Sequence, residues 1–376
     1  MFALAQRGAR AHAPPLARGF NSARNHIPVI RSLGQMRRWR AQARSLGLEV
    51  GLIPTMGALH DGHLNLVRAS VNRHPLTVMS LFVNPTQFAP HEDLNAYPRT
   101  FESDMDKLRG LLRQGPAAVI HGLGISEYDR RLPKQNPGPP QGESPLVVFA
   151  PTVDTMYPLR GELQNLTEHK GATIHVKGWG DVMEGASRPQ FFTGVSTVCT
   201  KLFNAVEPDH AYFGQKDIQQ ALLLKILQQD LLSSHPPPEN LHILPTTRDK
   251  DTGLALSSRN SYLSEPELKV APVLQRALKA ASSAWDNCAS GSTMIEVANR
   301  VVAEEQERIR NEGEDVVLTP DYFEVFDRQT FAPFRGTPTG EDKLVISGAL
   351  RVGKTRLIDN LLLGWDAEAL DVSNDV

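Results

Sequence analysis

The sequence predicts an α/β fold, in which helices cover both faces of a parallel sheet, followed by a smaller C-terminal α+β domain. Short apolar runs alternate with longer stretches of helical period through the first two thirds of the chain, which has 376 residues. Polar segments follow the apolar runs, at the carboxyl ends of strands, where ligands bind in such sheets. After about residue 247 this alternation stops.

The alternating part contains five predicted strands and four predicted helices. The strands are residues 50–54, 77–83, 117–122, 210–214 and 241–247, and the helices are residues 61–74, 100–114, 195–206 and 218–232. The helix over residues 100–114 has a typical start, because Thr100 can cap it and acidic residues fill its first turn. Phe101, Met105 and Leu108 share one face of this helix.

The remaining sequence predicts a small α+β domain. Ser264 with Glu267, and Thr293 with Glu296, have the spacing of capping boxes at helix N-termini. Strand-like runs follow at residues 321–327, 343–350 and 356–363. We therefore expect one domain over residues 27–247 and a second over residues 248–376. The Pro- and Gly-rich residues 130–145 are expected to form a loop insertion in the first.

Charge is unevenly distributed along the chain. Residues 1–48 hold nine Arg and no acidic residue, so the other residues carry 31 basic and 42 acidic side chains, a balance of −11. This acidic body is a poor match to a nucleic-acid-binding protein. No apolar run reaches the length of a transmembrane helix. The two cysteines, Cys199 and Cys288, predict neither a disulfide framework nor a cysteine-based zinc site.

The first 26 residues are Arg-rich and free of acidic residues, which is typical of a mitochondrial transit peptide. The same composition also suits a disordered basic tail on a cytoplasmic protein, and Pro14-Pro15 shortens any amphipathic helix there. The sequence therefore leaves a cytoplasmic and a mitochondrial location both open, and this segment is excluded from the predicted fold.

Two histidines, His60 and His63, lie where a predicted helix begins, after a predicted strand. An H-x-x-H pair can bind zinc, but no third ligand at a suitable spacing is evident, so no zinc is expected. As core residues the two would interrupt an apolar helix face. A helix N-terminus offers free N–H groups to a phosphate, and two imidazoles there could stabilise charge during phosphoryl or nucleotidyl transfer. Gly57 and Gly62 would let the backbone approach the ligand.

The segment 214–220 repeats this arrangement of strand end and helix start. Lys216 could reach a phosphate, Asp217 could face ribose hydroxyls or stabilise the helix start, and Gln220 could bind a substrate hydroxyl. An ordinary solvated helix start is the alternative interpretation.

Two further loops carry polar groups. Ser257, Ser258 and Arg259 would suit a polyphosphate, although the same residues could form a simple turn. Asn84 and Gln87 follow a predicted strand, where neutral amides could bind hydroxyl and carboxylate groups, or where Asn84 could only cap a proline turn.

Residues 348–355 match the P-loop pattern G-x-x-x-x-G-K-[ST]. A functional P-loop opens a helix and begins a large α/β domain. Here residues 356–363 resemble a strand, and only 21 residues follow Thr355. The match is therefore expected to be accidental.

Taken together, these segments resemble the pantoate–β-alanine ligase family. The matching residues are 54–67, 82–88, 97–100, 187–204, 212–220, 253–260 and 355–360, in the family's order within residues 30–365. The family belongs to the nucleotidyltransferases with an H-x-G-H signature, which share their nucleotide fold with class I tRNA synthetases. The resemblance implies a Rossmann-like nucleotidyltransferase domain with a C-terminal α+β lid domain, assembled as a homodimer.

The resemblance also implies a reaction, a step toward coenzyme A. ATP and (R)-pantoate give pantoyl adenylate and diphosphate, with Mg²⁺, and β-alanine then attacks the adenylate to give pantothenate and AMP. One alternative is a nucleotidyltransferase that releases an adenylylated product, which Gln87 and Gln220, both placed for a small polyol acid, disfavour. Another is a nucleic-acid-binding relative of tRNA synthetases, which the acidic body disfavours.

Roles for individual residues follow from the matched positions. His63 is implied as the proton donor, with His60, Lys216 and Arg259 as further catalytic residues. The implied ATP site is Met56, Gly57, His60, Gly62, His63, Gly214, Lys216, Asp217, Leu256, Ser257, Ser258 and Arg259. The implied pantoate site is Gln87, Gln220 and Asn84. Asp104 is an expected magnesium ligand, and Arg188 and Tyr97 are secondary candidates.

The chain departs from the family pattern in several places. Phe191 stands where many members have histidine, and Gln215 stands where Glu is common. The stretch before residue 256 is one residue longer than usual, which leaves the alignment of Thr247 uncertain. Residues 175–187 resemble an insertion.

Overall fold

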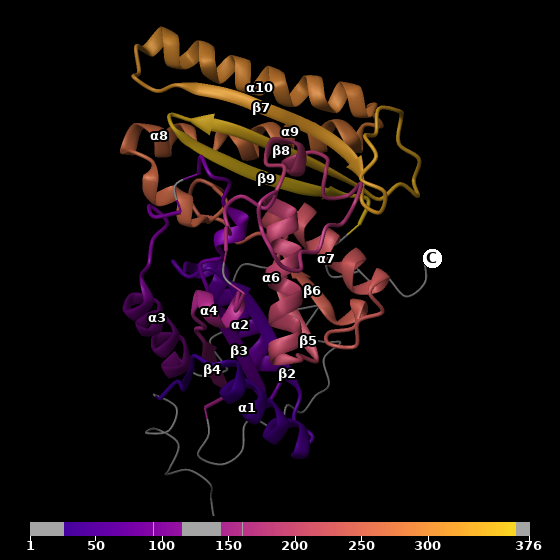
Figure 1. The fold of residues 1–376 in the computed structure, drawn as a ribbon. Helices are drawn as coiled ribbons and strands as arrows, with labels where there is room; N and C mark the ends of the chain where they lie inside the picture. Colours follow the sequence, from indigo (N-terminus) through magenta and orange to yellow (C-terminus); the bar gives the residue numbers. More distant parts are fainter. Residues whose placement is uncertain (1–25, 93, 115–143, 160, 366–376) are drawn as a thin grey trace, which may run out of the picture.

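The computed structural model describes residues 26–92, 94–114, 144–159 and 161–365. The larger part of the described chain is built on a six-stranded sheet with the order β1-β4-β3-β2-β5-β6 (Figure 1). Every strand pairing in this sheet is parallel. The strands are β1 (Val29–Ile30), β2 (Val50–Thr55), β3 (Leu76–Leu81), β4 (Leu146–Phe149), β5 (His210–Gly214) and β6 (Leu241–Leu244).

Helices cover both faces of this sheet because successive strand residues point to opposite sides. Leu52 and Val78 join one core cluster with α1, α6 and α7, whereas Ile53 and Met79 join another with α2 and α3. These helices are α1 (Leu33–Ser45), α2 (Asp61–Arg73), α3 (Phe101–Gln114), α6 (Phe191–Val206) and α7 (Ile218–Asp230). Short elements connect them: η2 (Pro85–Gln87), α4 (Val153–Met156), α5 (Glu184–Ser187), η4 (Gln215–Asp217) and η5 (Pro238–Asn240).

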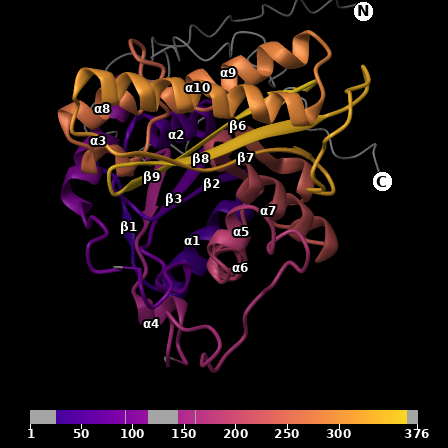
Figure 2. The same ribbon diagram turned by 90° about the horizontal axis from the view of Figure 1, so that it is seen from above.

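The C-terminal part forms a second layer with its own core. A three-stranded antiparallel sheet, in the order β7-β8-β9, packs against α9 and α10. Figures 1 and 2 show that this layer lies across one end of the parallel sheet. Its elements are η6 (Ser258–Tyr262), α8 (Glu265–Val270), α9 (Val273–Asp286), α10 (Gly291–Glu312), β7 (Leu318–Asp327), β8 (Leu344–Val352) and β9 (Thr355–Leu363). The predicted domain boundary near residue 247 stays a prediction.

Most predicted elements are confirmed, with ends that differ by a few residues. The predicted strand over residues 117–122 and most of the predicted loop over residues 130–145 lie outside the described residues. Sequence reasoning missed α1, β1 and β4. Strand β4 is only four residues long and directly follows the Pro- and Gly-rich stretch, so its apolar run was overlooked beside strong turn signals.

One helix start was predicted wrongly. The capping box of Ser264 with Glu267 is confirmed. In α10, however, the N-cap is Ser290, whose side chain accepts a hydrogen bond from the backbone of Thr293. The Ser290 cap places the helix start at Gly291, where a Cβ would meet the Phe334 carbonyl oxygen at 2.2 Å, so glycine suits this position.

The P-loop match is followed by a strand and not by a helix, as predicted. Residues 348–355 form the end of β8 and the turn into β9, where Val352 pairs with Thr355. No helix N-terminus is therefore available there to hold a phosphate. Within the described part of the chain, no helix is both long and apolar enough to cross a membrane.

Candidate active site

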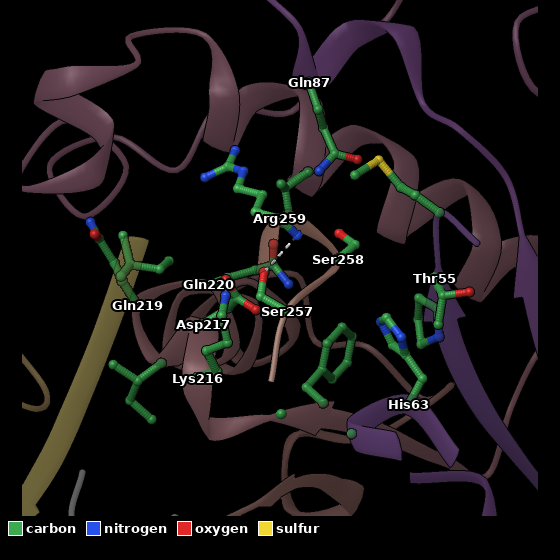
Figure 3. Close-up of a pocket in the computed structure, with 18 of the residues that line it drawn as sticks. Thr55, His63, Gln87, Lys216, Asp217, Gln219, Gln220, Ser257, Ser258 and Arg259 are labelled. Carbon is green, nitrogen blue, oxygen red and sulfur yellow. Dashed lines mark hydrogen bonds and ion pairs between the residues drawn. The ribbon is translucent and has the colours of Figure 1, made fainter. Parts of the chain in front are cut away.

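A cavity of about 550 Å³ lies at the carboxyl ends of β2, β3, β5 and β6, closed on one side by residues of β7, β8 and β9. It brings together most of the residues predicted from sequence, and Figure 3 shows His63, Gln87, Lys216 and Arg259 around the same space. The predicted residues that line it are Met56, His60, Gly62, His63, Asn84, Gln87, Gly214, Lys216, Asp217, Gln220, Leu256, Ser257, Ser258 and Arg259.

The two histidines cap helix α2 as a reciprocal pair. His60 is the N-cap, and its Nδ1 accepts a hydrogen bond from the backbone N–H of Gly62 at 3.1 Å. His63 Nδ1 accepts from the backbone N–H of His60 at 3.4 Å, and the ring centroids lie 4.1 Å apart. Because a neutral imidazole has one donor and one acceptor nitrogen, each ring carries its proton on Nε2. Both rings can therefore donate an Nε2–H hydrogen bond to a ligand.

Burial keeps these rings neutral at physiological pH. Burial, and then the charge of Lys216, lowers the pKa of His60 to about 4. Burial also lowers the pKa of His63 well below its usual value, and nearby His60 and Lys216 act in the same direction. The pair therefore suits an anion through dipolar N–H groups, while Lys216 and Arg259 supply positive charge. The role of His63 as a proton donor stays a prediction.

Asp104 shapes the loop before α2 and does not line the cavity. This carboxylate is 1% exposed. Its Oδ1 accepts from the Leu59 N–H at 2.8 Å, and its Oδ2 accepts from the Ala58 N–H at 3.0 Å and from Thr100 at 3.1 Å. Gly57 has a φ of +86° beside it, which favours glycine. These oxygens thus hold the loop before α2, and the expected magnesium ligation by Asp104 stays a prediction.

The two cationic segments approach the cavity from different elements. Lys216 lies in η4, between β5 and α7, with its Nζ 3.4 Å from Asp217 Oδ1. Ser257 caps η6 by accepting a hydrogen bond from the Arg259 backbone at 3.2 Å. The cap by Ser257 fixes the main chain of η6 locally, and both segments direct charged or hydroxyl groups toward the cavity (Figure 3).

Side-chain amides at the cavity form different contacts. Asn84 is 1% exposed, donates to Gln87 Oε1 at 2.9 Å, and accepts from the Tyr157 hydroxyl at 2.6 Å. Asn84 therefore orients Gln87, and its predicted role as a direct ligand of pantoate stays a prediction. Gln219 and Gln220 both line the cavity, and Gln219 also donates to the backbone carbonyls of Trp179 and Val182.

Sequence reasoning underrated several lining residues. Asn65 donates to the Thr247 hydroxyl at 3.0 Å, and both line the cavity. The position of Thr247 at the end of a predicted strand was the available signal. Asn65 gave no signal, because its partner is 182 residues away in sequence. Tyr322 and Asn360 reach the cavity from the second sheet.

Arg188 contacts Phe191, the position at which the chain departs from the family pattern. Its guanidinium binds Glu92 at 2.9 Å and the Gln87 carbonyl at 3.1 Å, and its central carbon lies 4.0 Å from the Phe191 ring centroid. Phe191 thus supplies a cation–π contact where many family members have histidine. Arg188 and Tyr97, the secondary candidates, both line the cavity.

Comparison with known proteins identifies the family. The model of the pantoate-beta-alanine ligase family matches residues 28–362. This chain belongs to the pantoate–β-alanine ligase family. A pantothenate synthetase from Moorella thermoacetica is 36% identical over 341 residues, covering 90% of this chain and 99% of the relative.

Solved structures agree with the family assignment. Pantothenate synthetase from Thermus thermophilus is 33% identical, with a TM-score of 0.66 over 89% of this chain and 99% of that one. Pantoate-beta-alanine ligase from Francisella tularensis, complexed with beta-gamma ATP and beta-alanine, shares the fold at 23% identity, with a TM-score of 0.59 over 91% of this chain and 100% of that one. The predicted family, the Rossmann-like fold with its C-terminal domain, and the pantoate–β-alanine ligase activity are confirmed. The individual residue roles, magnesium and the homodimer stay predictions.

Proposed function

We propose that this cavity activates the carboxylate of (R)-pantoate by adenylation with ATP, and that β-alanine captures the pantoyl adenylate. The observation that carries the proposal is the convergence of two neutral imidazoles, Lys216 and Arg259 on one cavity at the carboxyl ends of the strands. Carboxylate adenylation requires alignment on the α-phosphorus and neutralisation of phosphate charge, which these groups provide.

A covalent route through the enzyme is disfavoured by the chemistry of the thiol at the cavity. Cys199 lines the cavity, but burial raises the pKa of its thiol to about 12. A thiol with this pKa is protonated at neutral pH and is a poor nucleophile. The acyl group is therefore expected to remain on AMP until the amine attacks.

The phosphates of ATP fit the N-terminus of α2 and the two cationic segments. His60 and His63 would donate Nε2–H hydrogen bonds, and Lys216, Ser257 and Arg259 would neutralise charge on the diphosphate. A pantoate carboxylate oxygen forms a bond to the α-phosphorus, and the bond from this phosphorus to the bridging oxygen of diphosphate breaks. The amine of β-alanine then bonds to the acyl carbon, AMP leaves with the former carboxylate oxygen, and the nitrogen loses a proton.

Pantoate would lie against the polar amides and an apolar wall. Asn84 holds the Oε1 of Gln87, which leaves the Gln87 Nε2 to donate to a hydroxyl or carboxylate. Gln220 offers a second amide. Phe82, Phe192 and Val195 are buried and line the cavity, which suits the two methyl groups of pantoate.

Magnesium fits this cavity mainly as a companion of the nucleotide. Mg²⁺ binds through one or two carboxylates together with substrate phosphates and water. Asp217 lines the cavity, its side chain is 48% exposed, and its ion pair with Lys216 is long, at 3.4 Å, whereas arginines hold Glu92 at 2.9 Å and Glu184 at 2.7 Å. Asp217 would therefore supply the carboxylate ligand of Mg²⁺, and bound Mg²⁺ would reduce the negative charge of the phosphates.

The test is steady-state release of AMP and diphosphate from ATP and pantoate, with and without β-alanine. Sustained AMP formation is expected to require both pantoate and β-alanine. Continuous release of an adenylylated pantoate in the absence of β-alanine would instead support the nucleotidyltransferase alternative.

A further inference from the structure

Two adjacent residues of β9, Asp359 and Asn360, contact the two segments that carry the cationic residues of the cavity. We propose that this pair positions Lys216 and Arg259 for adenylyl transfer. The proposal rests on the proposed function, because it assumes that both cations act on ATP. The pair lies in the sequence segment 355–360, which resembles the family but had no assigned role.

Asn360 fixes the main chain around Lys216. Its Nδ2 donates to the carbonyl oxygens of Gln215 and Lys216, both at 2.9 Å. In return, Gln215 Nε2 donates to Asn360 Oδ1 at 3.2 Å. The turn η4 has no capping side chain of its own, because Gly214 occupies the N-cap position. The second sheet therefore supplies the side chain that holds this turn.

Asp359 fixes the approach to Arg259. Its carboxylate accepts two hydrogen bonds from the Arg248 guanidinium, at 2.5 and 2.9 Å. Arg248 also donates to the Gly253 carbonyl at 3.3 Å and forms an isolated β-bridge with Ala255. This ion pair thereby secures the reversal over residues 248–255, which leads directly into the cavity-lining residues 256–259.

Burial argues that these contacts are specific. Asp359 is 2% exposed and Asn360 is 1% exposed. Adjacent strand residues point to opposite faces, so a single dipeptide can hold two different loops. Burying an amide or a carboxylate costs free energy unless the group makes hydrogen bonds or ion pairs. If these two positions served packing alone, apolar side chains would be sufficient. Strand β9 also packs against both η4 and η6.

The test for Asn360 is a double-mutant cycle with Lys216. Asn360→Leu is expected to lower kcat/KM for ATP by about ten- to a hundred-fold, since small misplacements of a catalytic group have effects of this size. In a Lys216→Ala background, the same change should lower kcat/KM by less than about two-fold. If Asn360→Leu does not fold, Asn360→Ser serves in the same cycle.

The matched control is Gln228→Leu. Gln228 is also a buried amide that donates to a main-chain carbonyl, that of Pro236 at 2.8 Å, but it lies in the last turn of α7, outside the cavity lining. We expect a similar loss of thermal stability from Gln228→Leu and an unchanged kcat/KM. If the two variants lower kcat/KM equally, or if the Asn360 and Lys216 effects simply multiply, the positioning proposal for Asn360 is wrong.

The second arm pairs Asp359→Asn with Arg259→Ala in the same kind of cycle. Glu305→Gln is its control, because Glu305 is another buried carboxylate bound by arginines, within α10. Asp359→Asn is expected to raise the KM for ATP several-fold and to leave the KM for β-alanine unchanged, whereas Glu305→Gln should alter stability only. Multiplicative effects of Asp359→Asn and Arg259→Ala would overturn this arm.

The same experiment separates this proposal from the proposed function. If Lys216→Ala and Arg259→Ala each retain the wild-type kcat/KM for ATP, the assignment of the two cations fails and the positioning proposal fails with it. If both lose activity but neither cycle shows coupling, only the positioning proposal is wrong.

Discussion

Helix α2 has a histidine at each end, and the two ends differ in chemistry. His60 caps its N-terminus and faces the cavity with His63; we call these two the carboxyl-end pair, because they lie at the carboxyl ends of the strands. His74 caps its C-terminus and stacks with His210, which itself stacks on His242. We call these three residues the amino-end stack.

The two histidine clusters are alike in the spacing of their rings and in the direction of their pKa shifts. The ring centroids are 4.1 Å apart both between His60 and His63 and between His74 and His210. Burial lowers the pKa of His60, His74 and His210 to about 4 and that of His242 to about 2. Clustering and a perturbed pKa therefore do not by themselves identify a catalytic site.

The difference lies in what the ring nitrogens contact. In the amino-end stack, His74 Nε2 lies 2.6 Å from the Tyr212 hydroxyl, and His210 Nδ1 lies 3.0 Å from His242 Nε2. In the carboxyl-end pair, only Nδ1 is used by backbone N–H groups, and Lys216 lies close enough to lower both pKa values. The carboxyl-end pair therefore differs in that its Nε2–H donors can reach a ligand and lie beside a cavity and a cation, as its proposed role requires.

The stack is also poorly arranged for a metal. Ligand atoms of Glu49, His74 and His210 lie within 4.8 Å of one another. However, the rings of His74 and His210 are nearly parallel, with an interplanar angle of 19°. Because imidazole binds a metal in the plane of its ring, two stacked rings do not direct their lone pairs to a common point.

The largest expected effect is on the rate of adenylation, which should fall when the carboxyl-end pair is altered but not when the amino-end stack is altered. His63→Ala should lower kcat/KM for adenylation by about 10²–10³-fold, since it removes a donor that stabilises charge in the transition state. The loss of its cap contact should cost only about 1 kcal/mol of stability. His210→Ala, the control from the stack, should leave the rate within about two-fold. Equal losses of rate from both variants would remove the distinction.

The next effect is on the stability of the fold, which should fall when the amino-end stack is altered. His74→Ala should lower the free energy of unfolding by about 2 kcal/mol, because it leaves a gap in the core and removes a hydrogen-bond partner of the buried Tyr212 hydroxyl. Urea unfolding measures this change, and diphosphate release measures the rate, which should be unchanged. A stable His74→Ala variant with impaired turnover would assign the stack a role in catalysis.

Acid should destabilise the protein through both clusters. Because the folded pKa values near 4 lie below the unfolded value of about 6.5, the unfolded state binds more protons as the pH falls between these values. The stabilising contribution is thus complete above about pH 6.5 and declines toward pH 4. Urea unfolding at pH 7.5, 6 and 5 should show this decline, with a smaller slope in His74→Ala. A slope that does not change in His74→Ala would contradict the pKa shift of this residue.

The smallest expected effect concerns a misleading motif. Lys354 lies in the turn between β8 and β9, where no helix follows the P-loop pattern. Lys354→Ala should therefore change the KM for ATP by less than about two-fold. A large increase in this KM would show that the second sheet binds nucleotide directly.

Sequence reasoning located the cavity because it depends on local features. His60 and Lys216 each follow a predicted strand and Thr247 ends one, and in a parallel sheet the carboxyl ends of neighbouring strands meet at one edge. The positions of these strands and the helix start at Asp61 were predicted for the same reason.

The rest depended on contacts between distant segments. Asn360 is 145 residues away from its partner Gln215, and Asp104 is 45 residues away from the loop amide of Leu59 that it binds. Such pairings leave no periodic signal in a single sequence. The hydrogen bonds by which Asn84 holds Gln87 and Asp104 holds the loop before α2 likewise leave no signal in the sequence.

The most direct test of adenylation at the carboxyl-end cavity is a single turnover of ATP with pantoate in the absence of β-alanine, with enzyme in excess. The proposal predicts that diphosphate is released in this step, that pantoyl adenylate stays bound, and that added β-alanine then releases AMP and pantothenate. Release of diphosphate only after β-alanine is added would contradict an adenylate intermediate.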